Sequence, residues 1–223
     1  IMNAAHIGNY GVKSADVESN SVKIKGLIGR NLEERYSRLQ ADDSLQQYLE
    51  AQQVVSIYGV DTRALVAHIR NCGAMNCVIS SETTDLQVLK TRLSQTPSMK
   101  GLELASVVST KEVYETGNPH SRYRVAVFDY GVKKNILNCL TERGAYVRVY
   151  PAKTALQEIE DFNPHGYFMS NGPGDPAPME YAVQTIREIL QKEKPLFGIC
   201  LGHQLLAMAN GIPTFKMHHG HRG

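Results

Sequence analysis

The chain has 223 residues, enough for one large domain or two modest ones that each bury a proper core. Its 24 Lys and Arg residues against 22 Asp and Glu residues leave a formal net charge of +2, and no basic run is interleaved with aromatic residues, which argues against a nucleic-acid partner. No apolar stretch is long enough to cross a membrane, and no signal-peptide pattern opens the chain, so we expect a soluble, cytoplasmic protein.

The first half of the chain predicts short strands and capped helices. Val22 and Ile24 alternate with lysines, which favours a half-buried strand over 21–28. Further short apolar runs predict strands at 54–57 and 76–79, and N-cap residues before amphipathic stretches predict helices at 44–53, 61–71 and 85–93. These elements indicate a mixed α+β domain with no recognisable chemistry of its own.

A domain boundary is expected where the periodicity is lost. Between residues 101 and 123 no regular pattern is visible, and the turn-rich segment 116–121 is typical of a linker. We therefore predict an N-terminal domain over residues 1–117 and a second domain over residues 122–223.

The second half alternates strands with helices, a rhythm that predicts a doubly wound, mostly parallel sheet. Strands are expected at 123–128, 146–150, 166–169 and 196–199, and helices at 133–143, 155–161 and 182–191. Ligands of such sheets bind at the C-terminal ends of the strands. Three segments should converge there: residues 129–133, residues 170–176 and the turn around Cys200.

Cys200 lies in a Gly-x-Cys-x-Gly pattern between an apolar run and a helix-like stretch. The flanking Gly198 and Gly202 are typical of a nucleophile elbow, in which a tight strand-to-helix turn exposes one reactive side chain. A free cysteine is more commonly a small buried apolar residue. The two spaced glycines and the change from strand to helix favour the nucleophile. The other cysteines, Cys72, Cys77 and Cys139, have no C-x-x-C spacing for zinc and are expected to be free thiols.

A thiolate that attacks a carbonyl needs backbone N–H donors for the oxyanion that forms. The N–H of Leu201, directly after the nucleophile, is one natural donor, and Gly172 on the neighbouring loop is a second, although residues 171–176 could also be an ordinary surface turn. Gln204 could hydrogen-bond a polar substrate or could lie on the helix surface.

The motifs GICLGHQ (198–204) and SNGPGDP (170–176), in one chain, resemble a class I glutamine amidotransferase domain. FDYGVKKNI, SNGPGDPAP, FGICLGHQLLA and the closing MHHGHRG are similar to the small-subunit family of carbamoyl-phosphate synthetases. HIGNYG and GVDTRALVAHIRNCGAM resemble the N-terminal domain of that family, which other amidotransferases lack. The resemblance covers nearly the whole chain.

The resemblance implies that glutamine is hydrolysed through a γ-glutamyl thioester on Cys200. The ammonia would pass to a large synthetase subunit that forms carbamoyl phosphate for arginine and pyrimidine biosynthesis. By position in the motifs, Leu201 and Gln204 would contact glutamine, and Gly172 and Gly174 would offer backbone contacts. No cofactor is expected on this chain, because ATP, magnesium and bicarbonate would bind the large subunit.

The chain departs from the family pattern at both ends. The family's general base is a histidine, oriented by a glutamate, on a loop beyond the last residue here, and a glutamine-contacting serine is expected before the first. We therefore expect a truncated chain with little activity by itself, and we assign the base to none of His218, His219 and His221, which form a stretch that flanks the site. The alternatives are an inactive docking fragment and another γ-glutamyl cysteine hydrolase, against which the N-terminal domain argues.

Overall fold

The structure is a computed structural model that describes residues 1–4 and 6–220. It consists of two compact units. The first comprises Ile1–Ser98 together with the segment that begins at Lys216, and the second is Met99–Phe215. The predicted α/β class, with a mixed first part and a mostly parallel sheet in the second, is confirmed.

The first unit contains a small parallel pair of strands, β1 (Gly26–Ile28) and β2 (Val55–Ile57), after a single 3₁₀ turn at Ser14–Asp16. The helix α1 (Leu45–Ala51) connects the two strands, and the Ser44 hydroxyl caps it by accepting the Gln47 N–H at 3.2 Å. A core of three buried side chains lies between these elements: Ile7, Leu27 and Leu49.

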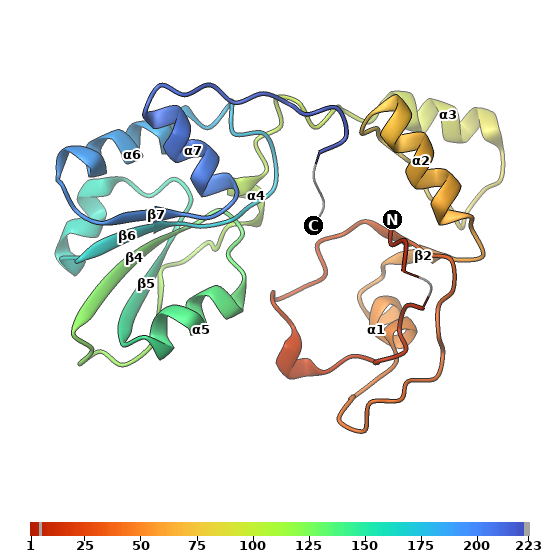
Figure 1. Cartoon of the computed structure of the whole chain (residues 1–223), viewed down its shortest axis with the longest axis horizontal. Coiled ribbons are helices and arrows are strands. Elements are labelled where there is room, and N and C mark those ends of the chain that lie inside the picture. Colours follow the sequence, from red (N-terminus) through yellow and green to blue (C-terminus); the bar gives the residue numbers. More distant parts are fainter. Residues whose placement is uncertain (5, 221–223) are drawn as a thin grey trace. The chain divides into compact units, whose positions relative to one another are not determined.

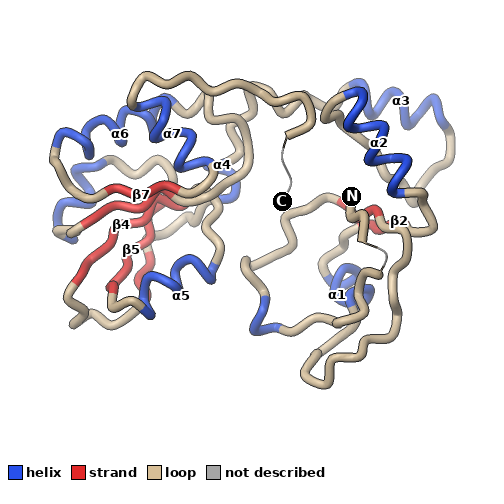
Figure 2. Tube along the Cα trace, in the orientation of Figure 1, coloured by secondary structure: helices blue, strands red, loops and turns tan. Residues whose placement is uncertain are grey.

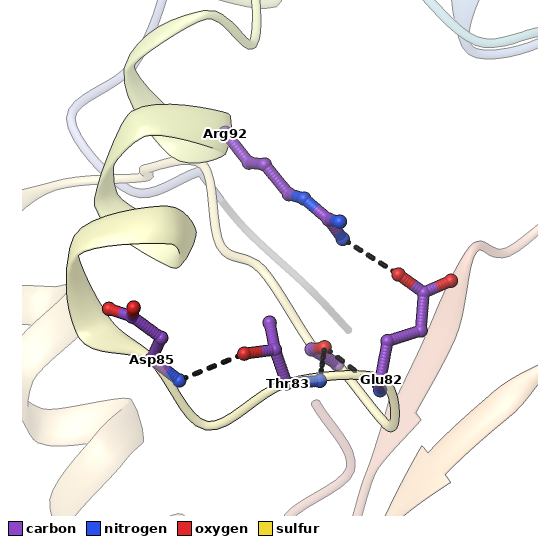
Figure 3. Close-up of polar contacts among 5 residues, drawn as sticks. Glu82, Thr83, Asp85 and Arg92 are labelled. Carbon is purple, nitrogen blue, oxygen red and sulfur yellow. Dashed lines mark hydrogen bonds and ion pairs between the residues drawn. The ribbon is translucent and has the colours of Figure 1, made fainter.

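Two further helices follow, and each begins at a predicted aspartate cap. Asp61 accepts the Ala64 N–H at the start of α2 (Thr62–Cys72). Figure 3 shows the approach to α3 (Leu86–Ser94), where the Asp85 N–H donates to the Thr83 hydroxyl at 3.1 Å. An ion pair of 3.0 Å between Arg92 and Glu82 then ties the last turn of α3 to the segment before the helix.

Two predicted strands of the first unit differ from the structure. The strand expected over 21–28 is reduced to β1, because β2 offers only three residues for pairing and Ile24 is exposed. The strand expected over 76–79 does not form. Its first residue, Asn76, instead donates its side-chain amide to the carbonyl oxygens of Thr96 and Pro97, and no described strand pairs with the segment.

The second unit is built on a five-stranded sheet in the order β3-β5-β4-β6-β7. Its four C-terminal strands are all parallel, as the sequence predicts: β4 (Tyr123–Asp129), β5 (Ala145–Pro151), β6 (Gly166–Met169) and β7 (Leu196–Gly198). The chain passes from β4 outward to β5 and then returns to the other side of β4 for β6. The strand order therefore reverses beside β4, the position at which doubly wound sheets bind ligands.

Helices cover both faces of this sheet (Figures 1 and 2). The predicted helices α5 (Lys134–Glu142), η2 (Leu156–Phe162, a 3₁₀ helix), α6 (Glu180–Gln191) and α7 (Leu201–Ala209) all form. Alternate strand residues enter opposite cores, so that Phe128 packs in the core under η2, α6 and α7 and Val127 in the core under α5. Among the described residues, no helix has both the length and the apolarity to span a lipid bilayer.

The segment before β4 differs most from its prediction. The residues between 101 and 123 contain α4 (Ala105–Val108) and β3 (Tyr114–Thr116), and β3 pairs antiparallel with β5. The turn at 117–121 therefore lies inside the second unit, and the units divide between Ser98 and Met99 rather than between 117 and 122. Neither element is longer than four residues, which is too short to produce a recognisable period.

Candidate active site

The three loops predicted to converge follow adjacent strands that end at the same level of the sheet. Phe128 of β4 is in register with Met169 of β6, and Met169 is in register with Gly198 of β7. The next residues along each strand direction are Asp129, Ser170 and Ile199. The segments 129–133 and 170–176 and the Cys200 turn therefore begin side by side at the C-terminal edge.

Cys200 occupies the strained turn that a nucleophile elbow requires. Its backbone has φ 53° and ψ −107°, a conformation that residues other than glycine rarely adopt. A Cβ on Gly198 would lie 2.6 Å from the Gly202 carbonyl carbon, and a Cβ on Gly202 would lie 2.1 Å from the Met169 carbonyl oxygen. Both flanking glycines are therefore required by close backbone approach, as the Gly-x-Cys-x-Gly pattern predicts.

Backbone hydrogen bonds hold the elbow against β6. The Ile199 N–H donates to the Met169 carbonyl at 3.1 Å, and the Gly202 N–H donates to the Ser170 carbonyl at 3.1 Å. The Cys200 side chain is exposed, and in the described part of the chain no group is hydrogen-bonded to its thiol. The thiol is thus presented to solvent on a rigid turn rather than packed in the core.

The two residues predicted to supply the oxyanion donors are neighbours in the structure. Leu201 is the first residue of α7, and Gly172 follows β6 by three residues. A Cβ on Gly172 would be 2.9 Å from Leu201 Cδ2 and 2.1 Å from the Tyr130 carbonyl oxygen. Within residues 1–4 and 6–220, neither the Gly172 N–H nor the Leu201 N–H has an acceptor. Both N–H groups are therefore open to a further acceptor, and their role as oxyanion donors stays a prediction.

Gly174 lies in the same loop but has different neighbours. Its φ of +100° favours glycine, and it forms an isolated antiparallel bridge with Glu103. The next residue, Asp175, accepts the N–H groups of Gly101 at 2.8 Å and Ala177 at 3.0 Å, and these bonds lower the pKa of its carboxyl group. Gly174 is thus part of the joint between the loop and residues 101–104, and its contact with glutamine stays a prediction.

Leu201 and Gln204 are placed very differently although both lie near the start of α7. The Leu201 side chain is only 1% exposed and packs in the core, so that its backbone, not its side chain, is available to a ligand. The Gln204 side chain is exposed, and its backbone N–H donates to the Cys200 carbonyl at 3.0 Å. The structure therefore leaves the Gln204 amide free to reach a polar ligand.

Three polar residues that sequence reasoning missed hold the loops together. Asp129 is buried and accepts three backbone N–H groups, from Gly131, from Val132 and, through its other oxygen, from Thr110, at 2.7 to 2.8 Å. The other two are Ser170, which bonds Tyr130, and Asn171, whose side-chain amide donates to the Gly131 carbonyl at 2.8 Å. The signal that could have found Asp129 is its position before Tyr-Gly at a strand end, because aspartates there often accept N–H groups two residues on.

The described histidines do not supply a partner for the thiol. His203 is exposed on α7 and has no hydrogen bond to Cys200. His218 belongs to the first unit, where its Nε2 is 3.2 Å from the Asn71 carbonyl oxygen, and its ring packs edge-on against His219. His221 lies outside the described residues. We assign the role of general base to none of these residues.

Two family models match the chain. Residues 126–223 match the model described as glutamine amidotransferase class-I. Residues 1–79 match the model described as carbamoyl-phosphate synthase small chain, CPSase domain. The first of these matches begins within β4 and contains β5, β6, β7 and the whole elbow, and the second contains β1, α1, β2 and α2.

Curated relatives cover nearly the full chain. It is 46% identical to the carbamoyl phosphate synthase small chain of Pseudomonas putida over 98% of its own length and 62% of that protein. The small chains of Synechococcus sp. and Chlorobaculum tepidum are each 44% identical to it, over 97% and 100% of this chain and 59% and 62% of theirs. The chain therefore spans about three fifths of the length of these relatives.

Proposed function

The chain belongs to the carbamoyl phosphate synthase small-chain family, and on that premise we propose that it carries the glutamine-hydrolysing centre of such an enzyme, with Cys200 as the nucleophile. The observation that carries the proposal is the elbow geometry. A cysteine with φ 53° is exposed between two glycines that no larger residue could replace. The next residue, Leu201, and Gly172 on the neighbouring loop each have a backbone N–H with no acceptor among the described residues.

The proposed reaction proceeds in two steps. The Cys200 thiolate attacks the side-chain amide carbon of glutamine, a C–S bond forms, and the oxygen becomes an oxyanion that accepts hydrogen bonds from the Leu201 and Gly172 N–H groups. The C–N bond then breaks, and the nitrogen leaves as ammonia with the proton that the thiol lost. Water hydrolyses the resulting γ-glutamyl thioester to glutamate and regenerates the thiol. The sum is glutamine plus water to glutamate plus ammonia.

Proton transfer between the thiol and the departing nitrogen requires a general base within hydrogen-bond reach. The family resemblance implies a histidine oriented by a glutamate. We propose that this role falls to such a histidine rather than to His203, His218 or His219. The strained elbow and the two N–H donors can be tested independently of that base.

We further propose that the ammonia is used by a large synthetase subunit, which binds ATP, magnesium and bicarbonate and forms carbamoyl phosphate. The match of residues 1–79 to the CPSase domain of small chains supports this assignment over a different γ-glutamyl cysteine hydrolase. We propose no cofactor on this chain.

The test is glutamine hydrolysis by the intact protein with its synthetase partner, measured as glutamate formed. Cys200→Ser should abolish turnover, and mass spectrometry of the native protein under glutamine should detect a γ-glutamyl adduct on Cys200. Cys139→Ser is the matched control, because Cys139 is a half-buried free cysteine on α5 of the same unit, and it should retain full activity. Full activity in Cys200→Ser would refute the assignment. Turnover of γ-glutamyl peptides in place of glutamine would favour the other hydrolase.

A further inference from the structure

Ser170 contacts all three of the loops at the C-terminal edge of the sheet. It is completely buried and directly follows β6, at the start of the loop that carries Gly172. The proposed chemistry gives its hydroxyl no role, because the hydroxyl is buried.

Four hydrogen bonds fix this residue. Its hydroxyl accepts the Tyr130 N–H at 2.8 Å and donates to the Asn171 carbonyl at 2.9 Å. Its own carbonyl accepts the Gly202 N–H at 3.1 Å, and its N–H donates to the Phe128 carbonyl at 3.2 Å. The backbone bond to Gly202 connects it to the elbow, and the hydroxyl connects the loop after β4 to the loop after β6.

The Tyr130 backbone that Ser170 holds lies directly against Gly172. The Gly172 Cα packs against the Tyr130 carbonyl so closely that a Cβ would lie 2.1 Å from that oxygen. Tyr130 itself is held at its N–H by the Ser170 hydroxyl and at its fully buried side chain, whose phenol contacts the Met169 sulfur at 3.4 Å. A shift of Tyr130 would therefore move Gly172 with it.

We propose that Ser170 is a positioning residue that sets the Gly172 N–H relative to Cys200, so that the oxyanion of the attacked amide is stabilised. The inference rests on the proposed function and deepens it. Ser170 touches no reacting atom. It acts through the Tyr130 backbone and through the loop that begins at Asn171.

The test is Ser170→Ala in the intact protein. Alanine keeps the backbone bond to Gly202 and removes both hydroxyl bonds. Complete loss of one oxyanion donor lowers kcat by about 100- to 1,000-fold, and a displaced donor retains part of its effect, so we expect kcat for glutamine to fall about 10- to 100-fold with KM changed less than about 3-fold.

Alkylation of Cys200 by iodoacetamide provides a second readout. If Ser170 were only structural, its loss would slow the alkylation of Cys200 together with glutamine turnover. The thiolate displaces iodide from a saturated carbon, and no oxyanion forms. The alkylation rate of Cys200, identified by peptide mass spectrometry, should therefore be unchanged in Ser170→Ala while glutamine turnover falls.

Ser109→Ala is the matched control. Ser109 is also buried, and its hydroxyl also accepts a backbone N–H, from Ala152 at 2.9 Å, and donates to a carbonyl, that of Thr110 at 3.3 Å, without contacting the elbow or Gly172. It should lose stability without losing kcat. If Ser170→Ala fails to fold, Ser170→Cys is measured in the same way, because its thiol is a weak donor and acceptor of similar size, and its kcat should also fall while Cys200 alkylation persists.

Three results would overturn the inference: wild-type kcat in Ser170→Ala, an equal loss in Ser109→Ala, or a loss of Cys200 alkylation that parallels the loss of kcat. A wild-type protein that does not hydrolyse glutamine would refute the proposed function and the inference with it. Glutamine turnover that persists unchanged in Ser170→Ala would refute the inference alone.

Discussion

Replacing Gly172 by alanine is the substitution that tests the proposed oxyanion site most directly. The methyl group would lie 2.1 Å from the Tyr130 carbonyl oxygen and 2.9 Å from Leu201 Cδ2. Folded proteins essentially never contain such contacts, so the loop must shift away from the Tyr130 backbone. Gly172 is not among the residues with positive φ, so the clash and not the backbone conformation is the cause.

The magnitude follows from two separate effects. Overpacking against backbone costs about 1–3 kcal/mol of folding stability. Withdrawal of the Gly172 N–H from the oxyanion removes one donor, which is worth about 100- to 1,000-fold in kcat, or about 2.7–4 kcal/mol of transition-state stabilisation. KM should change little, because a donor in the proposed role acts on the charge that develops in the transition state more than on the ground-state carbonyl.

The assay is steady-state glutamine hydrolysis by the intact protein, together with thermal unfolding. Gly144→Ala is the control, because Gly144 lies in the connection between α5 and β5 with φ +79°, and a Cβ added to it would have no neighbouring atom within 4 Å. That variant should lose about 1 kcal/mol of stability from the unfavourable φ and keep its kcat. A Gly172→Ala protein with kcat within about threefold of wild type would refute a donor role for this loop.

Three further predictions concern the elbow, the neighbouring loop and the first turns of α7. Cys200→Gly should be more stable to denaturant than Cys200→Ala by about 1–3 kcal/mol, because glycine relieves the strain of φ 53°, and both should be inactive; equal stabilities would argue against strain. The backbone bonds that lower the pKa of Asp175 stabilise the fold above about pH 4, and this stabilisation is lost as the pH falls through the lowered pKa. Asp175→Asn should therefore lower the Tm at pH 7 but not at about pH 2. A change in Tm that is independent of pH would contradict this assignment. Gln204→Ala should leave stability within about 0.5 kcal/mol of wild type and raise KM about 3- to 10-fold. Leu201→Ala, in contrast, should cost about 2–5 kcal/mol of unfolding free energy. A stability loss in Gln204→Ala would show that its side chain is structural.

The elements that sequence reasoning predicted well are those whose signals are local. Ser44, Asp61 and Asp85 mark helix starts through their own side chains, and all three cap the expected helices. The elbow is also encoded locally, because Gly198 and Gly202 allow close approach wherever a strand turns into a helix.

Some strand predictions failed because strand pairing depends on a distant segment. The alternation around Val22 and Ile24 favours a strand, but only the last three residues of the run find a partner in β2. Conversely, β3 lies in an aperiodic stretch and forms because β5 offers it an edge. Pairing is a property of two segments, and the pattern of one segment cannot report it.

The sequence by itself therefore determined the alternation of strands and helices, the strained cysteine turn and the family, because each depends on residue types at short spacing. Only the tertiary structure decided which groups meet at the C-terminal edge of the sheet. Register and strand order place Gly172 against Leu201, bury the Leu201 side chain while exposing Gln204, and bring the Ser170 hydroxyl to the Tyr130 backbone across 40 residues of sequence. These contacts join residues far apart along the chain, so that they depend on the packing of the whole sheet.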